Sequence, residues 1–214
     1  MGLAGKNVLV TGGTGFIGSH LTETLVETGA NVTVPYLSID PKSYFCQKGL
    51  DKQVRLVPLD IKDFKKIFAA ICRFEINFVF HLAAVAIVPI AYINPLETLG
   101  TNFMGTANLL EAARLYGKVG GIIIVSSDKA YGKIKRATET DPVSGDHPYE
   151  TSKAAADMLA TTYFKTYGLP IVVARFGNVY GEGDLNFSRI IPGIMKSLAL
   201  NKTLLVRSNG KYVR

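Results

Sequence analysis

The sequence predicts an α/β fold in which helices cover both faces of a doubly wound parallel sheet. Three observations support this fold class. Short apolar runs of strand length alternate with helix-like segments, as in chains built from βαβ units. Of the 214 residues, 48% are hydrophobic, which is enough for one well-buried domain but not for two comfortable ones. No internal repeat or low-complexity tract interrupts the pattern.

Six runs have the length and the apolar content of strands. They read KNVLVT (6–11), NVTVPY (31–36), QVRLVPL (53–59), NFVFHL (77–82), GIIIVS (121–126) and PIVVAR (170–175). The helix-like segments between them lie near residues 16–27, 63–74, 95–116 and 151–167. Right-handed crossovers between parallel strands then give a Rossmann-type sheet, whose ligands bind at the carboxyl ends of the strands. Functional residues are therefore expected directly after strands.

Composition narrows the classes of function. Cys46 and Cys72 stand in no Cys/His cluster, so we expect neither a metal site nor a disulfide framework, and a cytoplasmic setting fits best. The longest apolar stretch, residues 82–93, is interrupted by Pro89 and is shorter than the roughly 20 residues that span a membrane. The net charge is +7, but the basic residues are scattered except at 133–136, which favours a solvated surface over nucleic-acid binding.

A glycine-rich turn joins the first strand to the first helix. Residues 12–18 read GGTGFIG, so three glycines stand where each has a separate task. Gly12 allows a tight turn, Gly15 lets the backbone approach a pyrophosphate, and Gly18 lets the helix pack closely. The positive end of the helix then faces the phosphate charge. The turn predicts a dinucleotide site that also includes Thr14, Phe16 and Ile17.

The second and third strands say less about the cofactor. Residues 31–37 carry no acidic residue to bond an adenosine ribose, and no Arg to accept a 2′-phosphate. This strand therefore does not separate NAD from NADP. Asp60 follows the third strand, where it fits the N-cap of the helix that begins near Asp63.

Tyr149 and Lys153 stand four residues apart, so on a helix they share one face, a single turn apart. An adjacent ammonium and the positive nicotinamide ring would favour the phenolate and make Tyr149 a base at neutral pH. The spacing also fits an amphipathic helix with a buried Tyr and an exposed Lys. Ser127, which follows the apolar run 121–126, either bonds a reacting oxygen or caps the strand end.

In this order, the glycine-rich turn, Ser127, Tyr149 and Lys153 resemble the extended short-chain dehydrogenases/reductases, and in particular the NAD-dependent epimerase/dehydratase branch. The resemblance covers essentially the whole chain. It implies bound NAD, with NADP left open, a nucleotide-sugar substrate, and a nicotinamide ribose held by Lys153. Cofactor contacts are implied for Asp60, Ile61, Leu82, Ala83, Ala84 and Asn102.

Two polar residues in the matching segments are expected to have structural tasks. His81 ends the fourth strand, where a core histidine is the better interpretation. Asn102 is expected to order the active-site helix more than to touch substrate.

Asp128 and Lys129 distinguish the reactions open to such a chain. With Ser127 they read SDK, which resembles the nucleotide-hexose 4,6-dehydratases and is most like CDP-glucose 4,6-dehydratase. A 4-epimerase needs no acid or base beyond Ser127 and Tyr149. Eliminating water across C5 and C6 needs an additional acid and an additional base. The resemblance implies that Tyr149 takes the O4 proton, Lys129 or a neighbour the C5 proton, and that Asp128 protonates the departing hydroxyl. The alternative is two charged residues that simply meet water.

Substrate contacts are expected after the last strand. Residues 175–184 and 188–192 resemble the same dehydratases, in which the Asn contacts the substrate diphosphate and the Arg lies nearby. Asn178 and Arg189 are the matching positions, although an Asn in a turn is the alternative for Asn178. Residues 85–91, VAIVPIA, depart from the family, which usually places polar or basic substrate contacts there. This departure leaves the sugar and the nucleotide open.

We expect residues 1–184 to form the NAD(P)-binding Rossmann domain and residues 185–214 to begin a substrate-binding domain that is largely missing. The family continues past the motif at residues 208–214, so the 214-residue chain is expected to bind NAD but to turn over substrate poorly.

The two long helices carry apolar faces that include Leu109, Leu110, Ala113, Ala155, Met158 and Leu159. In the family such helices pair across a two-fold axis, which implies a homodimer, and cover for the sheet is the alternative. Three functions remain: a nucleotide-sugar 4,6-dehydratase, a 4-epimerase of the same family, and a non-catalytic NAD-binding protein.

Overall fold

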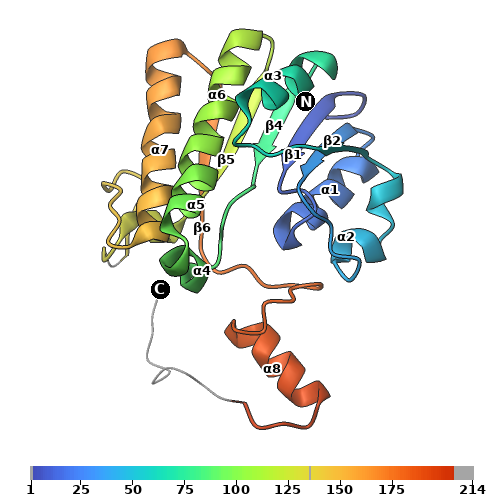
Figure 1. The fold of residues 1–214 in the computed structure, drawn as a ribbon, viewed down its shortest axis with the longest axis vertical. Coiled ribbons are helices and arrows are strands. Elements are labelled where there is room, and N and C mark those ends of the chain that lie inside the picture. Colours follow the sequence, from blue (N-terminus) through green and yellow to red (C-terminus); the bar gives the residue numbers. More distant parts are fainter. Residues whose placement is uncertain (1, 135, 205–214) are drawn as a thin grey trace.

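The computed structural model describes residues 2–134 and 136–204, and in these residues six parallel strands form one sheet (Figure 1). The strands are β1 (Asn7–Thr11), β2 (Asn31–Tyr36), β3 (Arg55–Pro58), β4 (Phe78–His81), β5 (Gly121–Ser127) and β6 (Ile171–Phe176). Their order is β3-β2-β1-β4-β5-β6, which is that of a doubly wound Rossmann sheet. The predicted fold class is therefore confirmed. The order reverses between β1 and β4, the point at which such sheets bind ligands.

All four predicted helices are present. The longer helices are α1 (Phe16–Glu27), α3 (Phe64–Arg73), α6 (Gly105–Tyr116), α7 (Pro148–Tyr167) and α8 (Ile190–Ala199). Shorter helical elements are α2 (Tyr44–Gln47), η1 (Leu50–Lys52), α4 (Val88–Ile93), α5 (Pro95–Leu99) and η3 (Asp128–Tyr131). The last of the four predicted helices begins at Pro148, three residues earlier than predicted, because proline suits the first turn of a helix. Tyr149 and Lys153 therefore both lie on α7.

The predicted helix 95–116 is one helical run with an irregularity. A π-helical turn, η2 (Gly100–Met104), separates α5 from α6. A π turn holds one residue more than an α turn and is common at functional sites. Asn102 lies within this turn and is buried.

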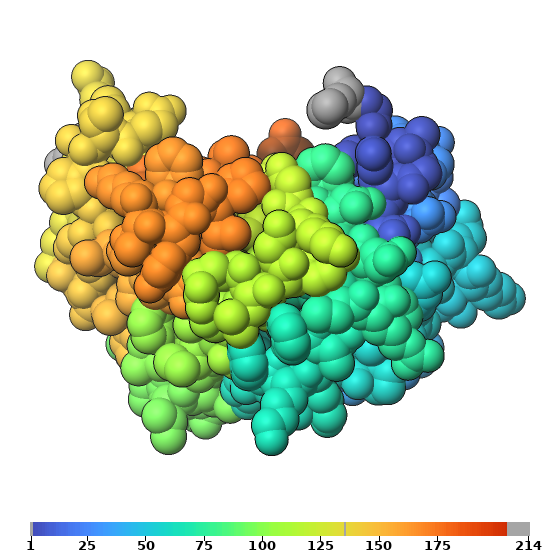
Figure 2. Space-filling view, turned by 90° about the horizontal axis from the view of Figure 1, so that it is seen from above, coloured from blue at the N-terminus to red at the C-terminus, as the bar shows by residue number. Residues whose placement is uncertain are grey.

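Two apolar layers cover the faces of the sheet. On one face, Leu9, Val79 and Ile122 pack against α3, α6 and α7. Figure 2 shows these three helices side by side along that face, in agreement with their mutual contacts. On the other face, Val8 and Val34 pack with residues of α1. Alternating residues of a buried strand thus serve opposite layers, as a parallel sheet requires.

The apolar faces of the long helices divide between core and surface. Leu109, Leu110 and Ala113 are fully buried, so these residues cover the sheet, as the simpler interpretation held. Met158 on α7 is 59% exposed. The surface that remains for a partner therefore differs from the one expected from sequence.

The segment after β6 leaves the layered part of the fold. Figure 1 shows α8 standing apart from the sheet, joined to β6 by a long loop. Residue 135 of the basic cluster and residues 208–214 of the terminal motif lie outside the described residues.

Three further features bear on the sequence predictions. Cys46 and Cys72 are both free thiols. Within residues 2–134 and 136–204, no three side chains of the metal-ligating kinds gather into a cluster. No helix in the same ranges has the length and apolar character that crossing a membrane demands.

Candidate functional site

A cavity of about 680 Å³ opens at the carboxyl ends of the strands, where the sheet order reverses. It is lined by the glycine-rich turn, by the segments that follow β2 to β6, and by parts of α5 and α7. The residues predicted from sequence that line it are Gly12, Thr14, Gly15, Phe16, Ile17, Gly18, Asp60, Ile61, Leu82, Ala83, Ala84, Ser127, Asp128, Lys129, Tyr149, Lys153, Asn178 and Arg189. One fold feature thus brings together residues far apart in the sequence.

The glycine-rich turn is shaped by close backbone contacts. Gly12 has a φ of +72°, and a Cβ there would lie 2.7 Å from the amide nitrogen of Ala83. A Cβ on Gly18 would collide with the carbonyl oxygen of Gly12, so the helix packs against the turn itself. At Gly15 the nearest atom to a Cβ would be that same oxygen, at 3.3 Å, and no other lies within 4 Å. The turn is therefore tight on its inner side and open toward the cavity.

This open side fits a diphosphate. Gly15 is the N-cap of α1 and offers no side chain to bond the helix amides. The first N–H groups of a helix have no partner within the helix, and they carry the positive end of its dipole. Gly15, Phe16 and Ile17 line the cavity at this point. The residues present thus suit an anionic group such as the pyrophosphate of a dinucleotide.

Ser127, Tyr149 and Lys153 are each only 8% exposed at the floor of the cavity. The Lys153 ammonium donates to the carbonyl oxygen of Val125 at 2.8 Å, which ties α7 to β5. The Ser127 hydroxyl donates to the Asp128 carboxylate at 3.1 Å and accepts from the amide of Lys129 at 3.2 Å. Ser127 therefore caps η3 and lines the cavity, so the two interpretations offered from sequence are compatible.

Burial dominates the electrostatics of the pair on α7. It lowers the pKa of Lys153 to about 8. It also raises the pKa of the Tyr149 phenol, against the effect of a hydrogen bond with Ser127. The charges that act on this phenol are those of Asp128, which raises its pKa, and Arg189, which lowers it. In the protein without ligand desolvation thus prevails. The argument from sequence concerns a Tyr149 phenol beside both Lys153 and the nicotinamide ring, and it stays a prediction.

Lys129 lies beside a buried carboxylate. Its ammonium is 4.0 Å from the Glu150 carboxylate, which is also 3.1 Å from the imidazole of His147. The second oxygen of Glu150 accepts from the amide of Asp146 at 3.3 Å. Glu150 itself is only 7% exposed. Lys129, which lines the cavity, thus has a buried carboxylate beside it.

Asn102 is placed differently from the cofactor contact that the family resemblance implied. Its side-chain oxygen accepts from the amide of Val85 at 2.7 Å, and its amide donates to the carbonyl of Val85 and the hydroxyl of Ser152. It is 2% exposed and is not among the residues that line the cavity. Its bonds hold the segment after β4 against α7, so it orders the site from behind.

His81 is a core residue, as expected. It is 3% exposed, and its two ring nitrogens lie 2.7 Å and 3.0 Å from the hydroxyls of Thr11 and Thr106. Burial lowers its pKa to about 3, and the charge of Lys153 acts in the same direction. The imidazole is therefore neutral at physiological pH and serves to join β1, β4 and α6.

Asn178 and Arg189 line the cavity from the segments after β6. The Arg189 guanidinium lies 3.3 Å from the carboxylate of the buried Asp184 and 3.4 Å from the carbonyl of Val179. These contacts hold the arginine at the rim. By contrast, the Arg175 guanidinium is held in two short bonds to the Asp157 carboxylate, so its place is structural.

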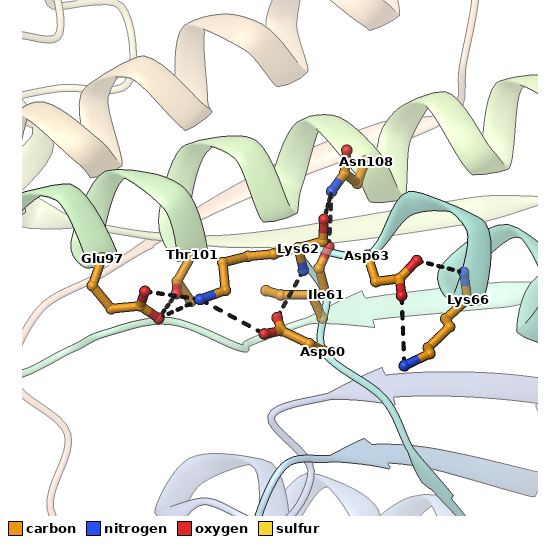
Figure 3. A network of polar contacts seen from close by, with 8 residues as sticks. All are labelled: Asp60, Ile61, Lys62, Asp63, Lys66, Glu97, Thr101 and Asn108. Atoms are coloured by element: carbon orange, nitrogen blue, oxygen red, sulfur yellow. Dashed lines mark hydrogen bonds and ion pairs between the residues drawn. The ribbon is translucent and has the colours of Figure 1, made fainter.

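The third strand leads into a charged cluster, drawn in Figure 3. The N-cap of α3 is Asp63, whose carboxylate accepts from the amide of Lys66. Asp60 instead accepts from the amide of Lys62 at 2.8 Å and lines the cavity. Asp60 is therefore not the helix cap that one interpretation of the sequence offered.

Several lining residues were missed by sequence reasoning. Glu97 and Thr101 reach the cavity from one face of the α5–η2 run, four residues apart. Their spacing was a usable signal, because residues four apart share a helix face. Residues 35–38, which span the end of β2 and the start of the following loop, also line the cavity, as expected at the carboxyl end of a strand. The apolar segment 85–89 forms another wall.

The chain is similar in sequence to known proteins of one family. The model of the NAD dependent epimerase/dehydratase family matches residues 8–214. CDP-glucose 4,6-dehydratase of Salmonella typhimurium is 35% identical over 222 residues, covering 95% of this chain and 60% of the relative. Human dTDP-D-glucose 4,6-dehydratase is 32% identical over 217 residues, covering 98% of this chain and 61% of the relative. The chain thus spans about 60% of the length of these two relatives.

Solved structures of enzymes with two different activities resemble the fold of this chain. UDP-glucose 4-epimerase from Thermotoga maritima, solved with UDP-glucose, aligns with a TM-score of 0.84 at 31% identity, covering 96% of this chain and 67% of that one. The dTDP-glucose 4,6-dehydratase of Streptomyces venezuelae, solved with NAD bound, aligns with a TM-score of 0.83 at 30% identity, covering 95% and 65%.

Proposed function

The chain belongs to the NAD dependent epimerase/dehydratase family, and on that premise we propose that it is the cofactor-binding part of a nucleotide-sugar 4,6-dehydratase. One observation carries the proposal. Asp128 and Lys129 line the same cavity as Ser127, Tyr149 and Lys153. A 4,6-dehydratase needs an acid and a base in addition to the oxidation machinery, and this cavity contains both.

The cofactor we propose is NAD. The glycine-rich turn would hold its diphosphate, with Asp60 and Ile61 at the adenine end and Lys153 at the nicotinamide ribose. When bound, NAD would supply the hydride chemistry, in which a hydride is taken from the sugar and later returned to it. Ala83 and Ala84 line the cavity with small side chains, which leaves room for a ring against the backbone.

The protein residues would handle four proton transfers. Tyr149 would take the proton from the O4 hydroxyl, with Ser127 bonding the same oxygen. The resulting 4-ketone acidifies the hydrogen on C5, which Lys129 would remove. Asp128 would protonate the C6 hydroxyl as it departs as water, and Lys129 would return a proton to C5 when the hydride is added at C6. Because burial keeps Tyr149 neutral in the free protein, the positive charge that favours its phenolate has to arrive with the ligand.

The substrate contacts proposed for this reaction are Asn178 and Arg189. A guanidinium at the cavity rim suits the diphosphate that joins a nucleoside to a hexose. Residues 185–214 would then begin the substrate-binding domain, after a Rossmann domain at residues 1–184. Which nucleotide and which hexose bind is left open, because the wall at 85–89 offers apolar side chains only.

A homodimer is also proposed, through the surface of α5, η2 and α7. Exposed apolar residues on this surface are Leu96, Leu99, Met104, Met158 and Phe164, of which Leu96 is 83% exposed. Exposed apolar side chains on neighbouring helices favour burial against a second copy. Light scattering at high protein concentration tests this, and a species that stays monomeric contradicts it.

A 4-epimerase is the second candidate, because a solved epimerase matches the fold as well as a solved dehydratase does. The test is incubation of the protein, at its full natural length, with CDP-, dTDP- and UDP-hexoses in deuterated water. Loss of one water from the sugar, with solvent deuterium at C5, supports the dehydratase. An isomerised hexose of unchanged mass supports the epimerase, and bound NAD without either product supports a non-catalytic role.

Matched variants sharpen the assay. Lys129→Met and Asp128→Asn should stop loss of water while the hexose is still oxidised at C4, which appears as reduced cofactor. Tyr149→Phe should stop both the oxidation at C4 and the loss of water. If Lys129→Met and Asp128→Asn leave the yield of dehydrated product unchanged, the assignment of the elimination step to these residues is wrong.

A further inference from the structure

The loop after β3 is fastened to the α5–η2–α6 helical run at three places. Ile61 is buried against Gly105, where a Cβ would lie only 2.5 Å from its side chain. Asn108 donates from its side-chain amide to the carbonyls of Ile61 and Lys62, at 3.1 Å and 2.9 Å. Lys62 reaches back and bonds Glu97 (Figure 3). The first two contacts are part of the packing, whereas the third is a partly exposed ion pair.

The ion pair between Lys62 and Glu97 is well formed. The Lys62 ammonium lies 2.7 Å and 2.8 Å from the two oxygens of the Glu97 carboxylate. Thr101, one turn later, donates its hydroxyl to the same carboxylate at 3.1 Å. The Lys62 ammonium is also 3.6 Å from the Asp60 carboxylate. Its stem passes Gly100, where a Cβ would lie in ordinary van der Waals contact with the Lys62 Cδ, 3.5 Å away.

The pair connects two walls of the cavity, and its lysine lies outside the lining. Asp60 and Ile61 line the cavity from the β3 side, and Glu97 and Thr101 line it from the helix side. Lys62, which bonds both sides, is not among the lining residues. Its position therefore sets the distance between two walls, and it also neutralises carboxylates that face an anionic ligand.

We propose that the Lys62–Glu97 pair is a positioning clip for the adenosine half of the dinucleotide, with Lys62 acting through Asp60 and Glu97 and not through direct contact. The inference rests on the proposed binding of NAD, because it takes the wall formed by Asp60 and Ile61 as the adenine end. It adds a residue outside the cavity to those that determine cofactor affinity.

The charges of the pair agree with this role. Glu97 raises the pKa of Lys62, and Lys62 lowers the pKa of Glu97, so both are ionised over the whole physiological range. Without Lys62, the carboxylates of Asp60 and Glu97 would line the site of an anionic ligand with no cation between them. Both mutual repulsion and a wider opening would then weaken adenosine binding.

A double-mutant cycle measures how much the Lys62–Glu97 pair contributes to NAD affinity. NAD affinity is measured by calorimetry on the 214-residue chain and on Lys62→Met, Glu97→Gln and the double variant. Lys62→Met is expected to weaken NAD binding roughly three- to fivefold, as for a partly exposed ion pair. The same substitution should cost clearly less in the Glu97→Gln background, because its partner is already neutral.

Two controls separate positioning from other effects. Lys66→Met removes an equal charge from an ion pair next to the same loop, with Asp63, and should leave NAD affinity unchanged. ADP-ribose should lose affinity as NAD does, whereas nicotinamide mononucleotide should not, which a general loss of stability would not produce. Additive effects in the cycle, or an equal loss for Lys66→Met, would overturn the clip while NAD binding stands. Failure of the unsubstituted chain to bind NAD would instead refute the proposed cofactor and, with it, the clip.

Discussion

The ammonium of Lys153 donates a hydrogen bond to the carbonyl oxygen of Val125, 2.8 Å away. This bond places a buried charge between the second turn of α7 and the end of β5. The charge is costly there, since desolvation lowers the pKa of Lys153 to about 8. A protein that keeps such a lysine gives up stability for a cation at the floor of its cavity.

Replacing this lysine should stabilise the free protein. The folded-state pKa of about 8 lies below the ordinary 10.5, so the cost is fully present below pH 8 and is relieved as the pH rises toward 10.5. We expect Lys153→Met to raise the free energy of unfolding by about 2 kcal/mol at pH 7, after loss of the bond to Val125. Urea unfolding at pH 7 and pH 10 measures this, with the exposed Lys165→Met as control. A gain that does not shrink at pH 10 contradicts it.

His81 should make the fold sensitive to mild acid. Its pKa falls from 6.5 to about 3 on folding, so the unfolded chain takes up the proton first. The stabilisation from a neutral His81 is complete above pH 6.5 and declines by about 2 kcal/mol by pH 5. Urea unfolding between pH 7.5 and pH 5 should therefore show a flatter profile for His81→Gln than for the unsubstituted chain. If the two proteins lose stability in parallel between pH 7.5 and pH 5, His81 is not the cause of the acid sensitivity.

Tyr149 should remain a neutral phenol in the absence of ligand. Burial raises its pKa above the ordinary value of 10.0. The difference in phenolate absorbance between the unsubstituted chain and Tyr149→Phe should thus appear only above pH 10. Saturation with NAD should move this difference to lower pH, because the nicotinamide ring brings a positive charge. A phenolate signal from Tyr149 at pH 8 without ligand would falsify the prediction.

Two glycines of the same turn should respond differently to alanine. At Gly18 the new Cβ would overlap the carbonyl of Gly12, so Gly18→Ala should destabilise the fold by about 3 kcal/mol or prevent folding. At Gly15 the nearest atom would be 3.3 Å away, so Gly15→Ala should fold with a modest loss. The Gly15 methyl would still meet the diphosphate and weaken NAD binding. Thermal unfolding and calorimetry on both variants distinguish these outcomes, and equal stabilities would contradict the packing argument.

The parts of the fold that the sequence predicted share one property: their signal is local. An apolar strand, a glycine turn and a helix follow one another within about twenty residues, so the first strand, its turn and the first helix can be predicted together. The same holds for Tyr149 and Lys153, whose spacing of four is meaningful as soon as a helix is assumed. Resemblance to a family then supplied the remaining set.

The parts that were missed or placed wrongly depend on distant partners. Asn102 was expected to order the active-site helix, but the partners that keep its amide from the cavity, Val85 and Ser152, are 17 and 50 residues away and no local pattern names them. The raised pKa of Tyr149 follows from burial, which only the packed fold defines. Glu97 lines the cavity and bonds Lys62, 35 residues earlier, and the sequence gives no sign of this bond.

Because of the π turn at Gly100–Met104, the helical run from α5 to α6 cannot lose or gain even one residue without a change in its geometry. Each residue of an α-helix advances the chain by about 100°, so deleting one residue here would restore a regular helix and rotate everything before it. Glu97 would then turn away from Lys62 while α6 kept its place in the core. Insertions and deletions should accordingly be rare in this stretch among functional relatives, even though its outer side faces solvent.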